Sequence, residues 1–300
     1  MKPIRSLAEM VARARSDPDR RVALAAGQDP ASIEAAARAV REGICRFTLV
    51  GEQERIAALC RERGLEEGLF QVEHRAYPEA ATARAVELVR TGEAGALMKG
   101  LVRTDLYMKA VLDKERGLLP PGALLSHLAL FELPAYPKLL FAADQAIIPL
   151  PDRAQKEMIL DYALAAARRF GIARPKAAFL AATEKVTDRM PATVEARSLA
   201  ALEEAKGAYL AGPLSLDLAI SREAAAAKGI DSPVAGDADI LIFPNIEAGN
   251  IFYKAATKLA GGTVAAIVTG TTAPCILTSR ADSEESKFLS IVLGCLLAAK

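Results

Sequence analysis

The sequence predicts an α/β protein with two successive α/β domains, mainly parallel sheets and an interdomain cleft. Short apolar or β-branched runs alternate with helical patterns along the whole chain, which is typical of strands joined through helices. The alternation starts again after Pro149 and Pro151. A chain of 300 residues has ample material for one or two compact cores.

The first half contains six predicted strands, and helices fall between most of them. These strands are expected at residues 22–26, 47–50, 70–73, 96–99, 124–130 and 139–143. Between the first two, Asp29 can cap a helix over residues 31–42, with Pro30 suited to its first turn and Gly43 to its end. This half is therefore expected to form a layered α/β domain.

The second half opens with apolar residues at helical spacing from Met158 to Phe170. Its strands are expected at residues 176–182, 207–211, 239–243 and 264–269. The apolar helix predicted over residues 284–297 is too short to be a domain and is expected to pack on the first one. We therefore predict one domain of residues 1–149 with 270–300, and a second of residues 150–269. The cleft between them is the expected site, because small-molecule sites favour domain interfaces and the carboxyl ends of parallel strands.

Composition excludes several classes of function. The charged residues make up 25% of the chain and nearly cancel to a net charge of +1, which argues against a nucleic-acid or anionic-membrane binder. No apolar run reaches the roughly 18 residues of a spanning helix, and the first residues do not resemble a signal peptide, so a cytoplasmic protein is expected. The four cysteines lack paired spacing and are expected to be free thiols; neither a disulfide nor a metal site is predicted.

The most informative stretch lies just before the C-terminal helix. Ser279 and Arg280 stand ahead of a helix start that Asp282 or Ser283 can cap. An arginine fork matches phosphate oxygens, and the first amides of a helix lie at the positive end of its dipole, so together they can bind an anion. A solvated helix cap is the alternative interpretation of these residues.

Polar residues also follow several predicted strands, where they exceed what a connection requires. They are Lys99 and Gly100 with Thr104 and Lys109, Ser126 with His127, Asp144, Thr193, and Asn245 with Gly249 and Asn250. Each also has a structural interpretation. Lys99 can be solvated, His127 can be a core histidine, Thr193 can cap its helix, and the two asparagines can satisfy loop backbone.

The order of these motifs resembles one family, the phosphate acetyl/butyryltransferases, and most closely its butyryltransferase branch. The resemblance covers about residues 90–300, while the earlier residues agree only in their β/α rhythm. The motifs that carry it are Lys99-Gly100, Leu125-Ser126-His127, Asp144, Met190-Pro191-Ala192-Thr193, Gly212-Pro213-Leu214, Ala235-Gly236-Asp237-Ala238-Asp239, Glu247-Ala248-Gly249-Asn250 and Leu277-Thr278-Ser279-Arg280-Ala281-Asp282-Ser283.

The resemblance implies a cytoplasmic enzyme that reversibly converts an acyl-CoA and inorganic phosphate into an acyl phosphate and CoA. It implies a fold similar to that of the isocitrate and isopropylmalate dehydrogenases, and a homo-oligomer of two or more subunits. CoA is a substrate in this reaction, and no cofactor is expected. Butyryl is the expected acyl group, and attack is expected to be direct, within a ternary complex.

The resemblance also assigns roles to individual residues. In the acetyltransferase branch a matching Ser-Arg pair lies at the reaction centre, so Ser279 and Arg280 inherit a catalytic role. The aspartate of that branch falls on Ser286 here, which leaves Asp282 and Glu285 as alternative bases for the CoA thiol. The expected substrate-binding residues are Lys99, Gly100, Thr104, Lys109, Ser126, His127, Asp144, Thr193, Asn245, Gly249 and Asn250.

Three other functions remain open at this point. A phosphate acetyltransferase of broad acyl specificity fits the same motifs. A metal- and nicotinamide-dependent dehydrogenase would share the fold, but the sequence lacks an aspartate set on one helix face and a GxGxxG after the first strand. A non-catalytic acyl-CoA or anion-binding protein would bind without turnover.

Overall fold

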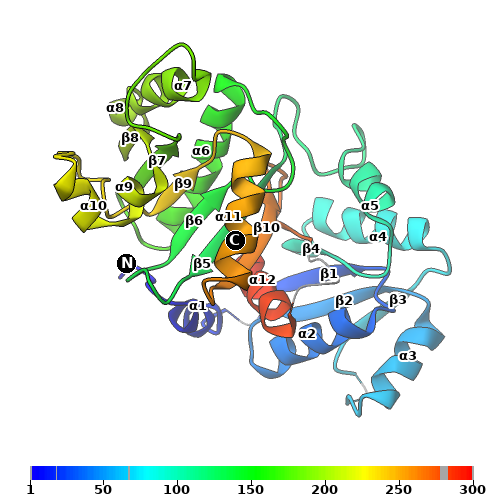
Figure 1. Ribbon diagram of the computed structural model, residues 1–300. Helices are drawn as coiled ribbons and strands as arrows, with labels where there is room; N and C mark the ends of the chain where they lie inside the picture. The colour runs from blue at the N-terminus through cyan, green and yellow to red at the C-terminus, as the bar shows by residue number, and fades with distance from the viewer. Residues whose placement is uncertain (1, 18, 67, 278–282, 299–300) are drawn as a thin grey trace. The chain divides into compact units, whose positions relative to one another are not determined.

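The computed structural model describes residues 2–17, 19–66, 68–277 and 283–298. The chain divides into two compact units (Figure 1). The N-terminal unit is made of residues 7–125 and 265–300, and the middle unit of residues 1–6 and 126–264. Both are α/β structures with mainly parallel strands, which confirms the predicted fold class.

In the N-terminal unit the strand order is β3-β2-β1-β4-β11-β10. Its strands are β1 (Arg21–Ala25), β2 (Arg46–Gly51), β3 (Gln71–His74), β4 (Ala96–Lys99), β10 (Thr263–Thr269, of which the last five residues belong here) and β11 (Cys275–Ile276). Neighbours from β3 to β11 are parallel, and β11 pairs antiparallel with β10. Its helices are α1 (Leu7–Ala14), α2 (Pro30–Arg41), α3 (Gln53–Glu62), α4 (Pro78–Arg90), α5 (Thr104–Val111) and α12 (Glu284–Leu297).

In the middle unit the strand order is β5-β6-β9-β7-β8. Its strands are β5 (Ser126–Glu132), β6 (Leu140–Ala143), β7 (Lys176–Leu180), β8 (Tyr209–Leu214) and β9 (Ile240–Ile242). β5 runs antiparallel to β6, and the other neighbours are parallel. Its helices are α6 (Arg153–Arg169), α7 (Pro191–Ala200), α8 (Glu203–Lys206), α9 (Leu216–Ile220), α10 (Arg222–Ala227) and α11 (Ile246–Lys258).

The division between the units falls at residues 125/126 and 264/265, whereas the sequence predicted 149/150 and 269/270. β5 and β6 belong to the middle unit because β6 pairs with β9. The first residues of the chain also belong there, since the amide of Ile4 donates to the carbonyl of Phe170 at 2.9 Å.

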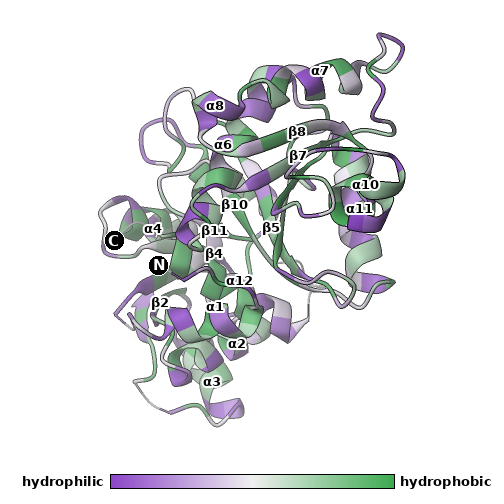
Figure 2. Ribbon diagram, turned by 90° about the vertical axis from the view of Figure 1, so that its left-hand side faces the viewer, coloured by the Kyte–Doolittle hydropathy of each residue, from purple (hydrophilic) through white to green (hydrophobic). Residues whose placement is uncertain are grey.

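Apolar residues form the cores of both units. In Figure 2 hydrophobic residues are concentrated on the strands, whereas α8, which has no buried residue, is hydrophilic. α12 is the most apolar of the helices at the N-terminal unit's core: residues 287–295 are buried, and the helix packs against α1 and α2. Among the described residues, no helix combines the length and apolar character that a membrane span requires.

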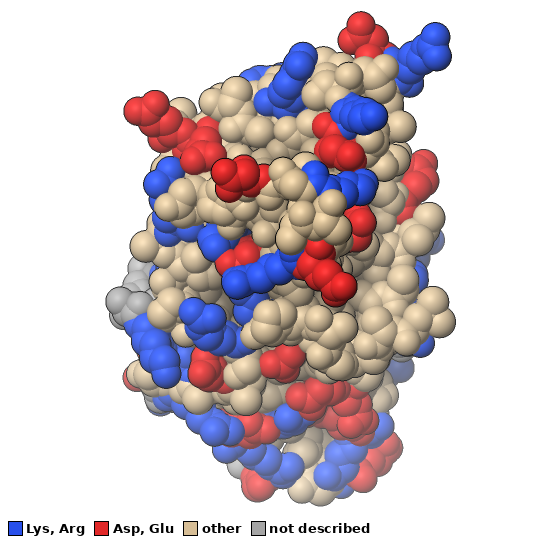
Figure 3. Space-filling model, turned by 60° about the vertical axis from the view of Figure 1, so that its left-hand side comes forward, with Lys and Arg blue, Asp and Glu red and all other residues tan. Residues whose placement is uncertain are grey.

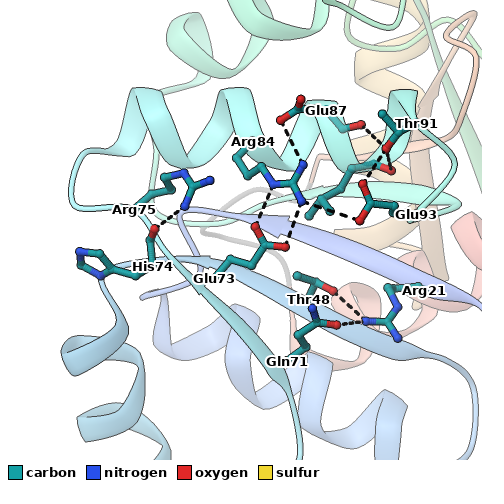
Figure 4. Close-up of polar contacts among 11 residues, drawn as sticks. Arg21, Thr48, Gln71, Glu73, His74, Arg75, Arg84, Glu87, Thr91 and Glu93 are labelled. Atoms are coloured by element: carbon teal, nitrogen blue, oxygen red, sulfur yellow. Dashed lines mark hydrogen bonds and ion pairs between the residues drawn. The ribbon is translucent and has the colours of Figure 1, made fainter.

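The outer strand of the N-terminal unit is held by ionic and polar side chains (Figure 4). Arg84 of α4 binds Glu73 of β3 through two hydrogen bonds, of 2.8 and 3.2 Å, and Glu87 at 3.0 Å. The hydrogen bonds from Arg84 hold the pKa of Glu73 below its ordinary value. On β1, Arg21 binds Thr48 at 3.2 Å and also Gln71. These contacts tie β3 to the rest of its sheet.

The amino ends of the parallel strands in the middle unit carry a cluster of charged side chains, which we call the amino-end cluster: Lys138, Lys176, Arg222, Asp237 and Asp239. Asp237 accepts ion pairs from Lys176 at 2.5 Å, Lys138 at 3.0 Å and Arg222 at 3.4 Å. Asp239 binds Lys138 at 2.5 Å and the amide of Lys176 at 2.9 Å. On the face shown in Figure 3, basic and acidic side chains are likewise intermixed.

Candidate active site

The direction of the strands brings several predicted site residues to the carboxyl ends of the parallel strands in the middle unit, opposite the amino-end cluster. β6 ends at Ala143, so Asp144 follows its carboxyl end. β5 runs antiparallel to β6, with Ala129 opposite Ala142, so Ser126 and His127 at the start of β5 lie at the same edge. Both are buried. The structure therefore brings together Ser126, His127 and Asp144, which the sequence had singled out separately.

Asp144 organises the loop that follows β6. Its carboxylate accepts hydrogen bonds from the amides of Ala146 at 2.8 Å, Ile147 at 3.0 Å and Ile148 at 3.2 Å. The peptide bond between Ala143 and Asp144 is cis. Only 4% of Asp144 is exposed. Its charge is thus compensated by backbone amides, and its observed contacts are those of a residue that fixes a loop.

His127 is paired with a residue that sequence reasoning missed. Its Nδ1 lies 2.9 Å from Oε1 of Gln145, and its ring contacts that of Tyr253 edge-on, with the centroids 5.9 Å apart. Gln145 is only 1% exposed. The available signal was a glutamine directly after Asp144 in an otherwise apolar run. Its partner lies 18 positions earlier, which no local pattern reveals.

The start of α11 packs on the same loop. Asn245 caps this helix by accepting from the amide of Ala248 at 3.0 Å, as its structural interpretation proposed. Gly249 lies so close that a Cβ there would be 2.3 Å from the carbonyl oxygen of Asp144. Asn250 donates from Nδ2 to the carbonyl of Gln145 at 3.3 Å. Gly249 and Asn250 therefore fix the backbone of Asp144 and Gln145.

The side chain of Thr193 forms hydrogen bonds within its own loop. It is fully buried, and its hydroxyl donates to the carbonyl of Met190 at 2.7 Å and accepts from the amide of Thr187 at 3.0 Å. These contacts shape the turn before α7, but Thr193 does not cap the helix, because the N-cap residue is Met190 and no side chain makes a cap hydrogen bond.

In the N-terminal unit, Lys99 and Gly100 follow the carboxyl end of β4. Nζ of Lys99 donates to the carbonyl of Gly100 at 3.4 Å. A Cβ on Gly100 would lie 2.4 Å from the carbonyl oxygen of Ala26, so only glycine allows this close approach of β4 to the end of β1. Thr104 and Lys109 lie on α5 and are exposed.

The C-terminal motif is described only from residue 283 onward, so Ser279, Arg280 and Asp282 lie outside the described residues. Ser283 caps α12 by accepting from the amide of Ser286 at 3.1 Å. Glu285 forms an ion pair with Arg38 of α2, and its side chain is half exposed. The guanidinium of Arg38 also stacks on the ring of Phe288, 3.8 Å from its centroid.

The four cysteines are free thiols, and Cys275 is the one nearest in sequence to the C-terminal motif. Its Sγ lies 3.7 Å from both the hydroxyl of Thr271 and the carbonyl of Ala273. Burial raises the pKa of the Cys275 thiol to about 11. Within the ranges that the structure describes, no group of three or more His, Cys, Asp or Glu side chains could hold a metal ion.

Comparison with known proteins decides the family. Residues 66–295 match the family described as phosphate acetyl/butaryl transferase. The chain is 39% identical to the phosphate butyryltransferase of Clostridium acetobutylicum over 98% of its own length and 99% of that protein. The chain belongs to this family. It is therefore an acyltransferase, as the order of its motifs predicted.

Further similarities are to another curated enzyme and to solved structures. The phosphate acetyltransferase of Thermotoga maritima is 40% identical over 93% of this chain and 95% of that protein. Among solved structures, a branched-chain phosphotransacylase from Enterococcus faecalis superimposes with a TM-score of 0.84 at 35% identity, covering 93% of this chain and 98% of that one. A 4-hydroxythreonine-4-phosphate dehydrogenase from Klebsiella pneumoniae, 13% identical with a TM-score of 0.59 over 94% of this chain and all of that one, shares the fold alone.

Proposed function

We propose that this phosphate acyltransferase prefers butyryl among short acyl groups and transfers it directly between CoA and phosphate. The preference is supported by the order of the motifs, which resembles the butyryltransferase branch; the chain is 39% identical to the butyryltransferases of two Clostridium species. The acetyltransferase of Thermotoga maritima is equally similar, so overall identity does not rank the acyl groups.

The proposed chemistry assigns phosphate to cationic residues. Arg280, with Lys99 or Lys109, holds the phosphate and balances its charge as it leaves, and Ser279 donates to the oxyanion of the tetrahedral intermediate. CoA carries a thiol whose pKa is about 8.5, so attack on an acyl phosphate requires a group that takes its proton. Asp282 and Glu285 were the candidates for this base. The ion pair of Glu285 with Arg38 engages its carboxylate and does not support that role.

The observation that carries the proposal of direct transfer is the burial of Cys275 together with the raised pKa of its thiol. A nucleophilic cysteine needs a lowered pKa and an accessible sulfur. Cys275 is 1% exposed, and its raised pKa of about 11 keeps it protonated near neutral pH. Bound phosphate is itself a competent nucleophile, so an acyl-enzyme would solve no chemical problem.

The test is phosphate-dependent release of CoA from acyl-CoAs of two to five carbons, compared as kcat/KM. Each buried methylene contributes about 0.8 kcal/mol, so two methylenes allow a preference for butyryl over acetyl of about tenfold. Equal or better use of acetyl-CoA would replace the proposed preference with that of a broad acetyltransferase. Binding of acyl-CoA without phosphate-dependent release would indicate a non-catalytic binding protein.

A further inference from the structure

The amino-end cluster lines a pocket whose residues all belong to the middle unit. The pocket has a volume of about 340 Å³, which lies in the range of small-molecule sites. Leu139, Lys176 and Asp239 line it, and they stand at or directly before the amino ends of β6, β7 and β9. Asp144 follows the carboxyl end of β6 instead. The pocket is therefore separate from the candidate active-site residues of the middle unit.

Positive charge predominates among the side chains of this pocket. Two carboxylates line it, those of Asp237 and Asp239, against five basic side chains. The basic residues are Arg5, Lys138, Arg174, Lys176 and Arg222. Lys138 pairs with both carboxylates, at 3.0 and 2.5 Å, and Lys176 pairs with Asp237 at 2.5 Å. Because the two lysines match the two carboxylates, the surplus of positive charge in the pocket comes from arginines.

Two of these arginines are arranged to bind a further anion. Among the described residues, the guanidinium of Arg222 makes a single ion pair, with Asp237 at 3.4 Å, and 78% of its side chain is exposed. Arg174 is fixed in position, because it stacks on the ring of Tyr209, 3.8 Å from the centroid, and pairs with Glu203 at 3.2 Å. A guanidinium has five donors in a planar fork that matches phosphate oxygens. One anion in the pocket can therefore accept hydrogen bonds from both arginines.

The other lining residues are apolar, and they indicate what kind of anion fits. They are Pro3, Ile4, Leu139 and Ile172. An apolar wall favours a ligand that carries a carbon group beside its charged group. A cation is disfavoured, because both carboxylates already pair with lysines and the surplus positive charge repels it.

We propose that this pocket binds a small organic phosphate, a monoester that carries close to two negative charges near neutral pH. Its oxygens accept hydrogen bonds from Arg222 and Arg174, and its carbon group lies against the apolar residues of the pocket. Asp237 competes with the ligand for Arg222, so their 3.4 Å ion pair breaks when the phosphate binds. A phosphate suits two arginine forks better than a carboxylate does, because it has more charge and more oxygens in one group.

The test is a titration of the full-length protein, labelled with ¹³C at the isoleucine methyl groups, with butyl phosphate at about pH 7.5. Ile4 and Ile172 line the pocket, and their signals are assigned through Ile4→Val and Ile172→Val. We expect both signals to shift saturably, with a Kd below about 1 mM. Inorganic phosphate and butyrate should each bind at least about tenfold more weakly, because the first lacks the carbon group and the second carries one charge.

Two substitutions in the pocket should change this Kd in opposite directions. Arg222→Gln removes a charged fork and should raise the Kd about tenfold or more. Asp237→Asn removes the competing carboxylate and should lower the Kd about fivefold. Arg153→Gln is the matched control, because Arg153 of α6 also makes an ion pair of 3.4 Å, with Glu157, and does not line the pocket. Its Kd should equal that of the unsubstituted protein.

Any of three results would overturn the inference. One is the absence of a saturable shift of Ile4 and Ile172 up to about 10 mM butyl phosphate. Another is the same Kd in Arg222→Gln as in Arg153→Gln, and the third is binding of butyrate as tight as that of butyl phosphate. Arg222 is mostly exposed, so its variant should fold, and the remaining methyl signals verify this. None of these measurements uses turnover, so they stand apart from any failure of the proposed acyl transfer.

Discussion

The amino and carboxyl ends of the strands in the middle unit's sheet carry polar residues in different arrangements. At the amino-end cluster, charges of opposite sign satisfy one another, and Asp237 alone binds three cations. At the carboxyl edge, the charge of Asp144 is satisfied by backbone amides, and His127 is paired with a neutral carboxamide. The ion pairs of the amino-end cluster neutralise one another and hold neighbouring strands together. At the carboxyl end, backbone amides and a neutral side chain fix the loop after β6.

The largest expected effect comes from moving the backbone at the carboxyl edge. Gly249→Ala places a Cβ 2.3 Å from the carbonyl oxygen of Asp144, so the loop that carries Gln145 must shift. A displacement of this size can reduce kcat/KM by about 100-fold. Gly95→Ala is the control, because its Cβ would meet its nearest neighbour at an ordinary 3.4 Å. Equal kcat/KM in the two variants would show that the loop after β6 takes no part in the reaction.

A smaller loss is expected from the C-terminal motif. If Arg280 pairs with phosphate, Arg280→Ala removes a charge-assisted contact of about 1.5–3 kcal/mol, and kcat/KM falls about tenfold or more. Arg280→Lys should restore only part of this, because lysine lacks the planar fork. An unchanged kcat/KM with a small loss in the free energy of unfolding would show that Arg280 does not bind phosphate, and would support the interpretation as a solvated helix cap.

Cys275 should matter little to turnover. Cys275→Ala is expected to keep kcat/KM within about threefold, with a loss of roughly 1 kcal/mol from packing. The comparison is made by steady-state kinetics alongside thermal unfolding. Abolished activity in a folded Cys275→Ala protein would show that the sulfur takes part in the reaction.

The amino-end cluster should affect stability and leave kcat/KM unchanged. Burial opposes ionisation of Asp237, but hydrogen bonds from Lys176 and Lys138 outweigh it and hold the pKa below its ordinary value of 3.8. This stabilisation is complete above about pH 4 and is lost as the pH falls through the lower, folded-state pKa. Asp237→Asn should therefore reduce the free energy of unfolding by about 1–2 kcal/mol at pH 7, with a difference that shrinks below pH 4. Urea unfolding at several pH values measures it; a pH-independent difference would rule out this ion pairing as the cause.

Local signals in the sequence predicted much of the fold. The strand expected at residues 96–99 is β4, and Asp29 caps α2 through the amide of Ser32, as its position before Pro30 predicted. The limits of the units could not be predicted in this way, because they depend on the pairing of β6 with β9, about 100 residues apart.

The residues of the candidate site were likewise predicted only in part. Residue types and motif order singled out His127, Asp144 and Asn250 without indicating that they meet. Gln145 was missed because its contacts are with residues far away in the sequence: His127 of β5 lies 18 positions away and Asn250 of α11 lies 105 positions away. Sequence reasoning assigned Asp144 to substrate binding, whereas its observed contacts are to the backbone of its own loop.

The account rests most directly on direct transfer within a ternary complex, and initial rates measured with butyryl-CoA and phosphate varied together test it. Direct attack predicts double-reciprocal lines that intersect, and a protein mass unchanged after incubation with butyryl-CoA alone. Parallel lines together with a butyryl adduct on the protein would contradict the account, since they require an acyl-enzyme that the buried, protonated thiol of Cys275 is not expected to form.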